Sequence, residues 1–224
     1  GLVSDAASPQ LSIRELDTVA QVFEASAVLS QVWGGDRTGM PPNLLRALAH
    51  SGNYAVGLFE GEHMVGASVA FFAEPDARSM HSHITGVLPS AQGQGFGRML
   101  KQHQREWGLR RGIGHVTWTF DPLVSRNAHF NLAVLGARVT EYLVDHYGAM
   151  DDGVNRGDES DRLMVSWALA SVAIPRDIES LRRREPDAAA VERRRVRDAL
   201  MTHLAAGRRI GGFDERRGDL IVDA

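Results

Sequence analysis

The sequence has 224 residues, 43% of them hydrophobic and 24% charged, as in globular proteins that bury a full core. It has no cysteine, which excludes disulfides, a thiolate nucleophile and cysteine-based zinc sites, and its formal net charge of −3 argues against general nucleic-acid binding. No apolar stretch approaches the roughly 20 residues that cross a bilayer and no signal-peptide pattern opens the sequence, so we expect a cytoplasmic protein with neither nucleic-acid nor membrane partners.

The first part of the chain predicts a strand, two helices and a hairpin. Asp17 is expected to cap the first helix, and the pair Pro41-Pro42 is expected to open the second, because proline is favoured in a first helical turn. In chain order, the strand is predicted at residues 10–14, the helices at 17–30 and 43–50, and the hairpin arms at 54–59 and 64–72.

The middle of the chain predicts a strand, a glycine-rich turn, a helix and a second strand. The helix has apolar residues at offsets that fit one face, namely Phe96, Met99, Leu100 and Trp107. This order implies a parallel strand pair joined by a right-handed crossover. In chain order, the strands are expected at residues 80–88, 115–120, 138–146 and 163–169, a further helix at 125–135, and a polar loop at 151–158.

The composition changes after Pro175. Residues 174–224 contain 12 of the 24 arginines, interleaved with ten acidic residues. A helix is predicted at 187–206, with Val196, Leu200 and Leu204 on one face, and a hairpin at 209–222. We therefore predict a main domain at residues 1–173 and a C-terminal appendage at 174–224. The appendage would either cover the substrate side of the main domain or support a homodimer.

The turn Gln92-Gly93-Gln94-Gly95-Phe96-Gly97 precedes a predicted helix. Its free backbone N–H groups and the helix dipole would both favour a phosphate. A plain tight connection is the simplest alternative. The turn lacks the Gly-Lys-Ser/Thr ending of a Walker-type loop, and its GxGxG spacing differs from the GxGxxG of dinucleotide-binding domains. Asp121 near the end of the following strand keeps a dinucleotide site open as an alternative.

The segment from Val87 to Leu100 resembles the signature of the GNAT acyltransferases. That family has V-x-P, then Q/R-x-x-G-x-G/A, then a helix with leucine, and Gln92, Gly95 and Gly97 fill the three defining positions. The resemblance extends over about residues 10–170 in the order of elements. It implies an α/β fold with a mixed, mostly antiparallel twisted sheet flanked by helices.

The resemblance also implies a function and a set of binding residues. The protein would move an acetyl group from acetyl-CoA, as co-substrate, to a primary amine of a small molecule, with no metal. Backbone amides of residues 92–97 would hold the CoA pyrophosphate, and the main chain of Val87 and Leu88 would pair with the pantetheine arm. The implied cofactor-binding residues are Val87, Leu88, Gln92, Gly93, Gln94, Gly95, Phe96, Gly97, Arg98 and Asn127.

His81 and His83 are the candidates for the general base. Residues two apart in a strand share a face, and an imidazole with a pKa near 6.5 can remove a proton at neutral pH. They stand eleven and nine residues before Gln92. GNAT enzymes often have a glutamate at the earlier position, and arylalkylamine acetyltransferases have a similar His-x-His pair. Two structural histidines are the alternative, and a metal site would lack a third ligand.

A general acid is harder to find. GNAT enzymes often carry a Leu-Tyr pair shortly before a glycine on the last signature helix, but this chain has Asn131-Leu132 before Gly136, on a helix about two residues shorter. Tyr142 is the predicted substitute, with Tyr147 and His129 as alternatives. The thiolate could also leave to water. Backbone N–H near Leu88 is expected to stabilise the oxyanion.

The same fold could act as an acyl-CoA-binding regulatory module without turnover, and a dinucleotide-binding oxidoreductase is a less favoured alternative. Lys101 is the single lysine, so Schiff-base chemistry would depend on it alone. His103 is expected to be solvated. Aromatic residues near the expected site favour an apolar or aromatic acceptor; they are Phe71, Phe72, Phe120 and Phe130.

Overall fold

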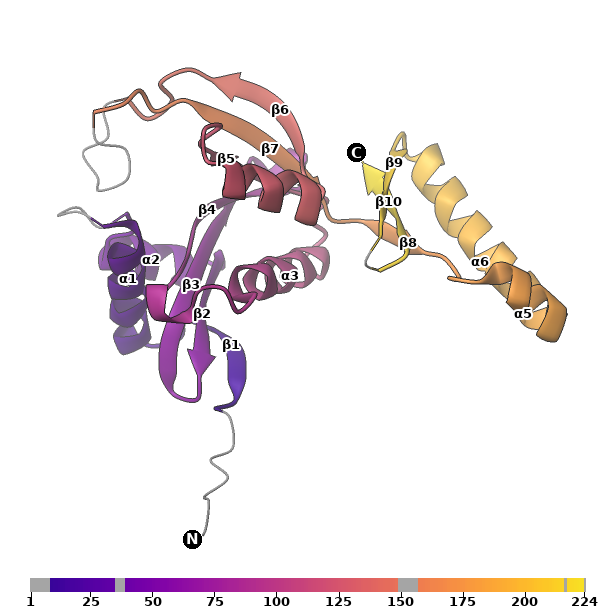
Figure 1. The fold of residues 1–224 in the computed structure, drawn as a ribbon, viewed down its shortest axis with the longest axis horizontal. Coiled ribbons are helices and arrows are strands. Elements are labelled where there is room, and N and C mark those ends of the chain that lie inside the picture. Colours follow the sequence, from indigo (N-terminus) through magenta and orange to yellow (C-terminus); the bar gives the residue numbers. More distant parts are fainter. Residues whose placement is uncertain (1–8, 35–38, 149–156, 216, 224) are drawn as a thin grey trace, which may run out of the picture.

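A computed structural model describes residues 9–34, 39–148, 157–215 and 217–223. Its main sheet has seven strands in the order β1-β2-β3-β4-β5-β7-β6, and every neighbouring pair is antiparallel except β4 and β5 (Figure 1). Its elements are β1 (Leu11–Glu15), α1 (Val19–Trp33), α2 (Pro42–His50), β2 (Tyr54–Glu60), β3 (His63–Phe72), β4 (Ser79–Val87), α3 (Phe96–Leu109), β5 (His115–Phe120), α4 (Ser125–Ala128), β6 (Arg138–Leu143) and β7 (Arg162–Ala168). The predicted elements of this part are therefore present in the predicted order.

Helix α1 begins one residue later than the sequence suggested. Thr18, not Asp17, is the N-cap: its hydroxyl accepts from the backbone of Gln21, and the Gln21 side chain accepts in return from the backbone of Thr18. This reciprocal pair is a capping box, which satisfies two N–H groups that a helix end leaves without partners. Asp17 contributes its own N–H to the same Gln21 side chain.

The core has two parts, one on each face of the main sheet. Helices α1 and α2 bury Leu29 and Leu45 against strands β2, β3 and β4. On the opposite face, α3 packs with the residues that follow β5, and its buried apolar residues are Phe96, Leu100 and Trp107. Met99 was predicted on the same stripe but is 38% exposed. Its place is taken by the polar residues Lys101, Gln104 and Arg105, which are buried.

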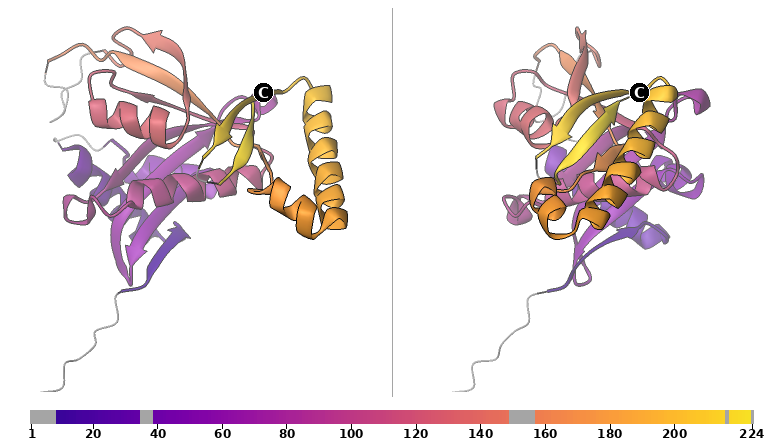
Figure 2. Two further views of the ribbon diagram at one scale, coloured as in Figure 1. Left: turned by 45° about the vertical axis from the view of Figure 1, so that its right-hand side comes forward. Right: turned by 90° about the vertical axis from the view of Figure 1, so that its right-hand side faces the viewer.

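The C-terminal part has its own small sheet. It contains β8 (Ser171–Ala173), α5 (Ile178–Arg184), α6 (Pro186–Ala205), β9 (Arg209–Asp214) and β10 (Asp219–Asp223), with strand order β8-β10-β9. The predicted hairpin is present, whereas α5 and β8 were missed. Ala189 is the buried residue of α6, and the predicted packing residue Leu204 is 52% exposed. Figure 2 shows this appendage as a separate layer beside the main sheet.

Two further sequence expectations concern the loop at 151–158 and membrane-spanning helices. The polar loop predicted at 151–158 lies largely outside the described residues. Within the described ranges, no helix is both long and apolar enough to cross a membrane.

A close approach between β4 and α1 gives a test of this packing. A Cβ on Gly86 would lie 3.0–3.1 Å from the side-chain carbons of Val32. Gly86→Val should therefore lower the free energy of unfolding by about 1–3 kcal/mol, measured by urea denaturation. Gly97→Ala is the matched control, because a Cβ there meets nothing within 4 Å. An equal loss in both variants would contradict the packing described here.

Candidate active site at the β4–β5 fork

Strands β4 and β5 pair over only three residues. The parallel ladder joins Ser79 to His115 and ends with His81 opposite Thr117. Beyond that pair, β4 continues for six residues, from Ser82 to Val87, still paired with β3 on its other edge. We call the opening between residues 82–87 and 118–120 the fork. Its two facing edges carry backbone groups that no neighbouring strand satisfies, and such groups require partners.

The alternation of hydrogen bonds along β4 shows which backbone groups face the fork. The N–H of Leu88 donates to the carbonyl of Val65 at 2.8 Å, so it points toward β3. Successive residues of a strand point in opposite directions, and the N–H of Val87 therefore points into the fork. The oxyanion donor that we expected near Leu88 is thus better placed at Val87. The carbonyl of Val87 accepts from the Gln92 side chain at 3.1 Å.

The glycine-rich turn has the geometry of an anion-binding turn. Gly93 and Gly95 have φ of 78° and 80°, a left-handed conformation that favours glycine. Gly95 is the N-cap of α3, with no side-chain cap. Among the described residues, no acceptor is recorded for the N–H groups of residues 93–98. A Cβ on Gly93, Gly95 or Gly97 would meet nothing within 4 Å, so open space surrounds these donors.

His81 and His83 both pack against the ring of Phe71. The centroid of Phe71 is 5.4 Å from that of His81 and 6.0 Å from that of His83. The two histidines are not part of a regular strand, because β4 pairs Ser82 with Ala70 and Ile84 with Val69, which leaves His83 as an extra residue. The bulge thus keeps both imidazoles on the same part of the sheet. Nδ1 of His81 is 3.0 Å from the hydroxyl oxygen of Thr117.

Both imidazoles are held in the neutral form. Burial, the largest cause, together with electrostatic repulsion from His83, Lys101 and His146, in that order, lowers the pKa of His81 from 6.5 to about 4. Burial also lowers the pKa of His83, against a hydrogen bond with the backbone of Gly39 that raises it. A neutral imidazole can accept a proton at neutral pH. The fork therefore has a turn with N–H groups open to an anion at one end and neutral imidazoles at the other.

The sequence comparison identifies the family. Residues 23–131 match the family described as "Acetyltransferase (GNAT) family". Residues 23–131 therefore belong to an acetyltransferase domain of the GNAT family. The general activity of such a domain is acyl transfer from an acyl-CoA to an amine. No curated protein matches the sequence significantly.

Solved structures agree with the GNAT fold. The ribosomal-protein-S18-alanine N-acetyltransferase of Escherichia coli superposes with a TM-score of 0.59 at 14% identity, over 72% of this chain and 95% of that one. YncA of Salmonella typhimurium, a putative acetyltransferase solved with acetyl-CoA, superposes with a TM-score of 0.56 at 19% identity, over 74% of this chain and 97% of that one. The mutant spermidine/spermine N-acetyltransferase SpeG of Vibrio cholerae superposes with a TM-score of 0.57 at 13% identity, over 71% of this chain and 95% of that one. These likenesses confirm the predicted fold.

The candidate acids of this GNAT domain lie in different places. The hydroxyl of Tyr142, on the edge strand β6, donates to Asp161 at 2.6 Å, and this hydrogen bond raises the pKa of Tyr142. Tyr147 reaches the fork instead: its hydroxyl is 2.9 Å from that of Thr119 on β5. His146 contacts the Tyr147 ring at 4.6 Å. The predicted role of Tyr142 stays a prediction, but its proton is held by Asp161.

The helix that carries the tyrosine in many GNAT enzymes has an unusual shape here. After the single turn of α4, the chain forms a π-helical segment, η3 (His129–Val134). Gly136, with φ of 75°, follows shortly after it. Asn131 is buried and Leu132 is 37% exposed. His129, the other alternative for the acid, is exposed at the start of η3.

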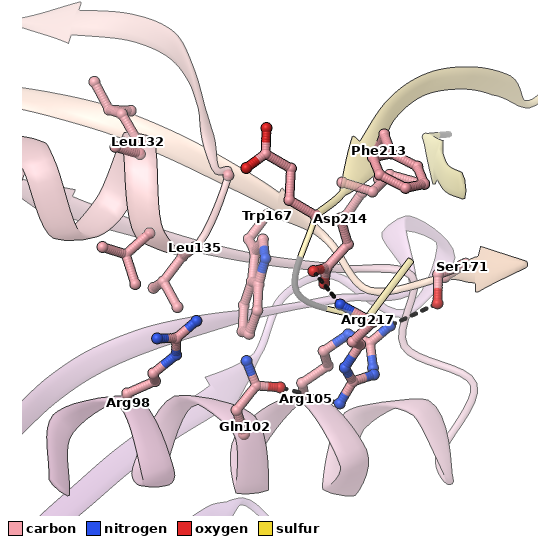
Figure 3. A pocket seen from close by; sticks show the side chains of 17 residues that line it. Arg98, Gln102, Arg105, Leu132, Leu135, Trp167, Ser171, Phe213, Asp214 and Arg217 are labelled. Carbon is pink, nitrogen blue, oxygen red and sulfur yellow. Dashed lines mark hydrogen bonds between the residues drawn. The ribbon is translucent and has the colours of Figure 1, made fainter. Parts of the chain in front are cut away.

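A cavity of about 720 Å³ lies between α3, η3, the end of β7 and the appendage (Figure 3). Arg98 and Arg105 of α3 line it from the main domain, and Arg217 lines it from the appendage. The Nε of Arg98 is buried and has no hydrogen-bond partner among the described residues. The cavity is on the α3 face of the sheet, whereas the histidines are at the fork. It is therefore not where the bases are found.

Several residues of this site were not predicted from the sequence. Thr117 and Thr119 alternate with Trp118 on β5, and this polar–aromatic alternation was the available signal. His146 helps to lower the pKa of His81. It lies in a turn whose position depends on contacts between residues that are distant in the sequence. His103 was expected to be solvated, but its Nδ1 lies 3.0 Å from the hydroxyl of the buried Tyr54. No group of three or more potential metal ligands occurs within the described ranges.

The environment of His81 predicts its titration. In an NMR titration of the imidazole signals, His81 should remain neutral through pH 6.5 and gain its proton near pH 4. The unfolded chain then binds more protons than the folded one between these values, so the free energy of unfolding should fall as the pH drops from 6.5 to 4. His83→Ala should raise the pKa of His81 by removing a neighbouring charge. A midpoint at 6.5 would contradict this environment.

Proposed function

We propose that this protein is an N-acetyltransferase that moves the acetyl group of acetyl-CoA to the primary amine of a small molecule, with the fork as its active site. One observation carries the proposal. The turn that presents free N–H groups at the start of α3 and the neutral His81 lie at the two ends of a single β4–β5 opening. A phosphate donor site and a base that share one opening suit attack by an amine on an acyl-CoA.

Acetyl-CoA would be held by main-chain groups and one arginine. The N–H groups of residues 93–98 suit the pyrophosphate, since they have no described acceptor and lie at a helix N-terminus. The edge of β4 that faces the fork suits the amides of the pantetheine arm. To accept a hydrogen bond from that arm, the carbonyl of Val87 would give up its contact with the Gln92 side chain. Arg98, in the first turn of α3, supplies a guanidinium whose buried Nε has no hydrogen-bond partner among the described residues. Asn127 on α4 stays a predicted contact.

His81 has better support than His83 as the general base. It occupies the last paired position of β4, directly beside the fork. When its Nδ1–H donates to Thr117, the lone pair of Nε2 is left free to take the proton that the attacking amine loses. Phe71, packed against both imidazoles, supplies an apolar wall for the acceptor. The other aromatic residues named for that role do not share this position: Phe72 stacks on Trp107, and Phe120 is buried in the core.

Ligand binding can be tested without knowing the acceptor. Acetyl-CoA should raise the melting temperature, because a ligand at a hundredfold excess over its Kd stabilises by about 2.7 kcal/mol. Gly97→Leu should abolish this shift, since its side chain would enter the open space before the turn while the unliganded protein keeps its own stability. Differential scanning fluorimetry measures both effects. Stabilisation by NADH and not by acetyl-CoA would favour the oxidoreductase alternative and contradict the proposal.

Turnover is tested by thiol release from acetyl-CoA in the presence of a panel of small primary amines. His81→Ala should lower kcat by about 10²–10⁴-fold, the usual contribution of a general base, while the acetyl-CoA-induced thermal shift persists. His83→Ala should have a smaller effect. A larger loss in His83→Ala would transfer the role to that residue. Binding of acetyl-CoA without amine-stimulated thiol release would favour the regulatory-module alternative.

A further inference from the structure

Lys101 is a buried amine without a counter-ion. Its residue is 6% exposed, and its Nζ donates to the Ser82 hydroxyl at 3.0 Å and to the Gln104 side-chain oxygen at 3.2 Å. The ring centroid of Trp118 is 3.9 Å from the same nitrogen. Within the described ranges, no carboxylate forms an ion pair with it. Burial of an unpaired charge is costly, and such groups concentrate at functional sites.

This amine lies at the closed end of the fork, where β4 and β5 begin to separate. Ser82 is the first residue of β4 beyond the last paired residue, and Trp118 is the first residue of β5 beyond its partner. Nζ of Lys101 contacts both, so it lies where the two strands begin to separate. It arrives from α3, which packs on the face opposite to α1 and α2.

His81 faces the other way. Successive residues of a strand point to opposite faces, and both neighbours of His81 face α3: Met80 belongs to the core cluster under that helix, and Ser82 bonds Lys101. The imidazole of His81 therefore approaches the fork from the face opposite to Lys101. An acyl group between the strands would have a base on one side and an ammonium donor on the other.

We propose that Lys101 is the proton donor to the thiolate that leaves during acyl transfer. This inference rests on the proposed function. The acceptor nitrogen forms a bond to the acyl carbon and gives its proton to His81, while the carbon–sulfur bond breaks and its electron pair stays on sulfur. The Nζ–H of Lys101 then gives its proton to that sulfur. After the products leave, the proton on His81 passes to solvent and the Lys101 amine takes one back.

The chemistry of the site supports this role. The pKa of Lys101 is lowered by burial to about 7, below the value of about 8.5 for an ordinary thiol, so transfer to a thiolate is favourable. On β4, His81 is the titratable group coupled to Lys101, whereas β5 presents Trp118 and α3 presents Gln104, both uncharged. The tyrosine that many GNAT enzymes carry on the last signature helix is absent, and α3 covers the same face as that helix.

The single lysine of this chain allows a direct measurement. A sample labelled with ¹⁵N at lysine Nζ gives one side-chain signal, which should titrate near pH 7 in the unliganded protein. Adding CoA, whose free thiol is the product of the reaction, should shift that signal. A midpoint near pH 10, or a signal that does not respond to saturating CoA, would overturn the proposal.

Kinetics with two acetyl donors separates a proton donor from a structural residue. Lys101→Met should slow transfer from acetyl-CoA by about 10²–10⁴-fold but should change transfer from p-nitrophenyl acetate less than about threefold, because the nitrophenolate leaves without a proton. Gln104→Met is the matched control, since it alters the same buried cluster and should affect both donors by equal factors. Equal losses with both donors in Lys101→Met, or acetylation of Lys101 found by mass spectrometry, would overturn the proton-donor role. A wild-type protein that binds no acetyl-CoA would instead overturn the proposed function.

Discussion

The early end of the β4–β5 ladder is the constraint on which the rest of the site depends. Three residue pairs hold the strands together, and beyond His81 the facing backbone edges have no strand partner. A buried backbone group left without a hydrogen bond costs about 1–3 kcal/mol, so an opening of this kind favours any ligand that supplies donors and acceptors in an extended conformation. Because β4 remains paired with β3 as far as Val87, the opening keeps its shape without its second neighbour.

The polar groups at the fork share an electrostatic pattern. His81 is surrounded by other basic groups, and Lys101 is buried without a carboxylate, so both have pKa values below their ordinary ones. In each case the largest cause is loss of water, and for His81 the next is the charge of His83. Each group weakens protonation of the other. A site with this pattern disfavours protonation of both groups at once and gains affinity for negative charge whenever either of them is protonated.

Local sequence patterns predicted most elements and the glycine-rich turn before α3, because strand alternation, helical periodicity and glycine in a left-handed turn are all set by nearby residues. One error was local, and the others came from contacts between distant segments. Thr18 caps α1 instead of Asp17, because it forms a capping box with Gln21. The sequence leaves this open, since both adjacent residues are of types that can cap a helix. Met99 fits the apolar stripe of α3 but is exposed, since Lys101 and Gln104 occupy the space under β4 and β5. The bulge at His83 could not be seen in a sequence that alternates as a regular strand does.

Helix α3 connects the two ends of the candidate site. Its N-terminus presents the N–H groups of the glycine-rich turn, and Lys101 lies six residues after the N-cap Gly95, roughly 9 Å along the axis at 1.5 Å per residue. Phosphates bound at the N-terminus would fix the end of the helix from which Lys101 extends to the base of the fork. The last signature helix, shortened and completed by a π turn, has no tyrosine to place there. In this chain the element proposed to bind the phosphates is therefore also the element that carries the candidate proton donor, so binding and proton transfer would depend on the position of one helix.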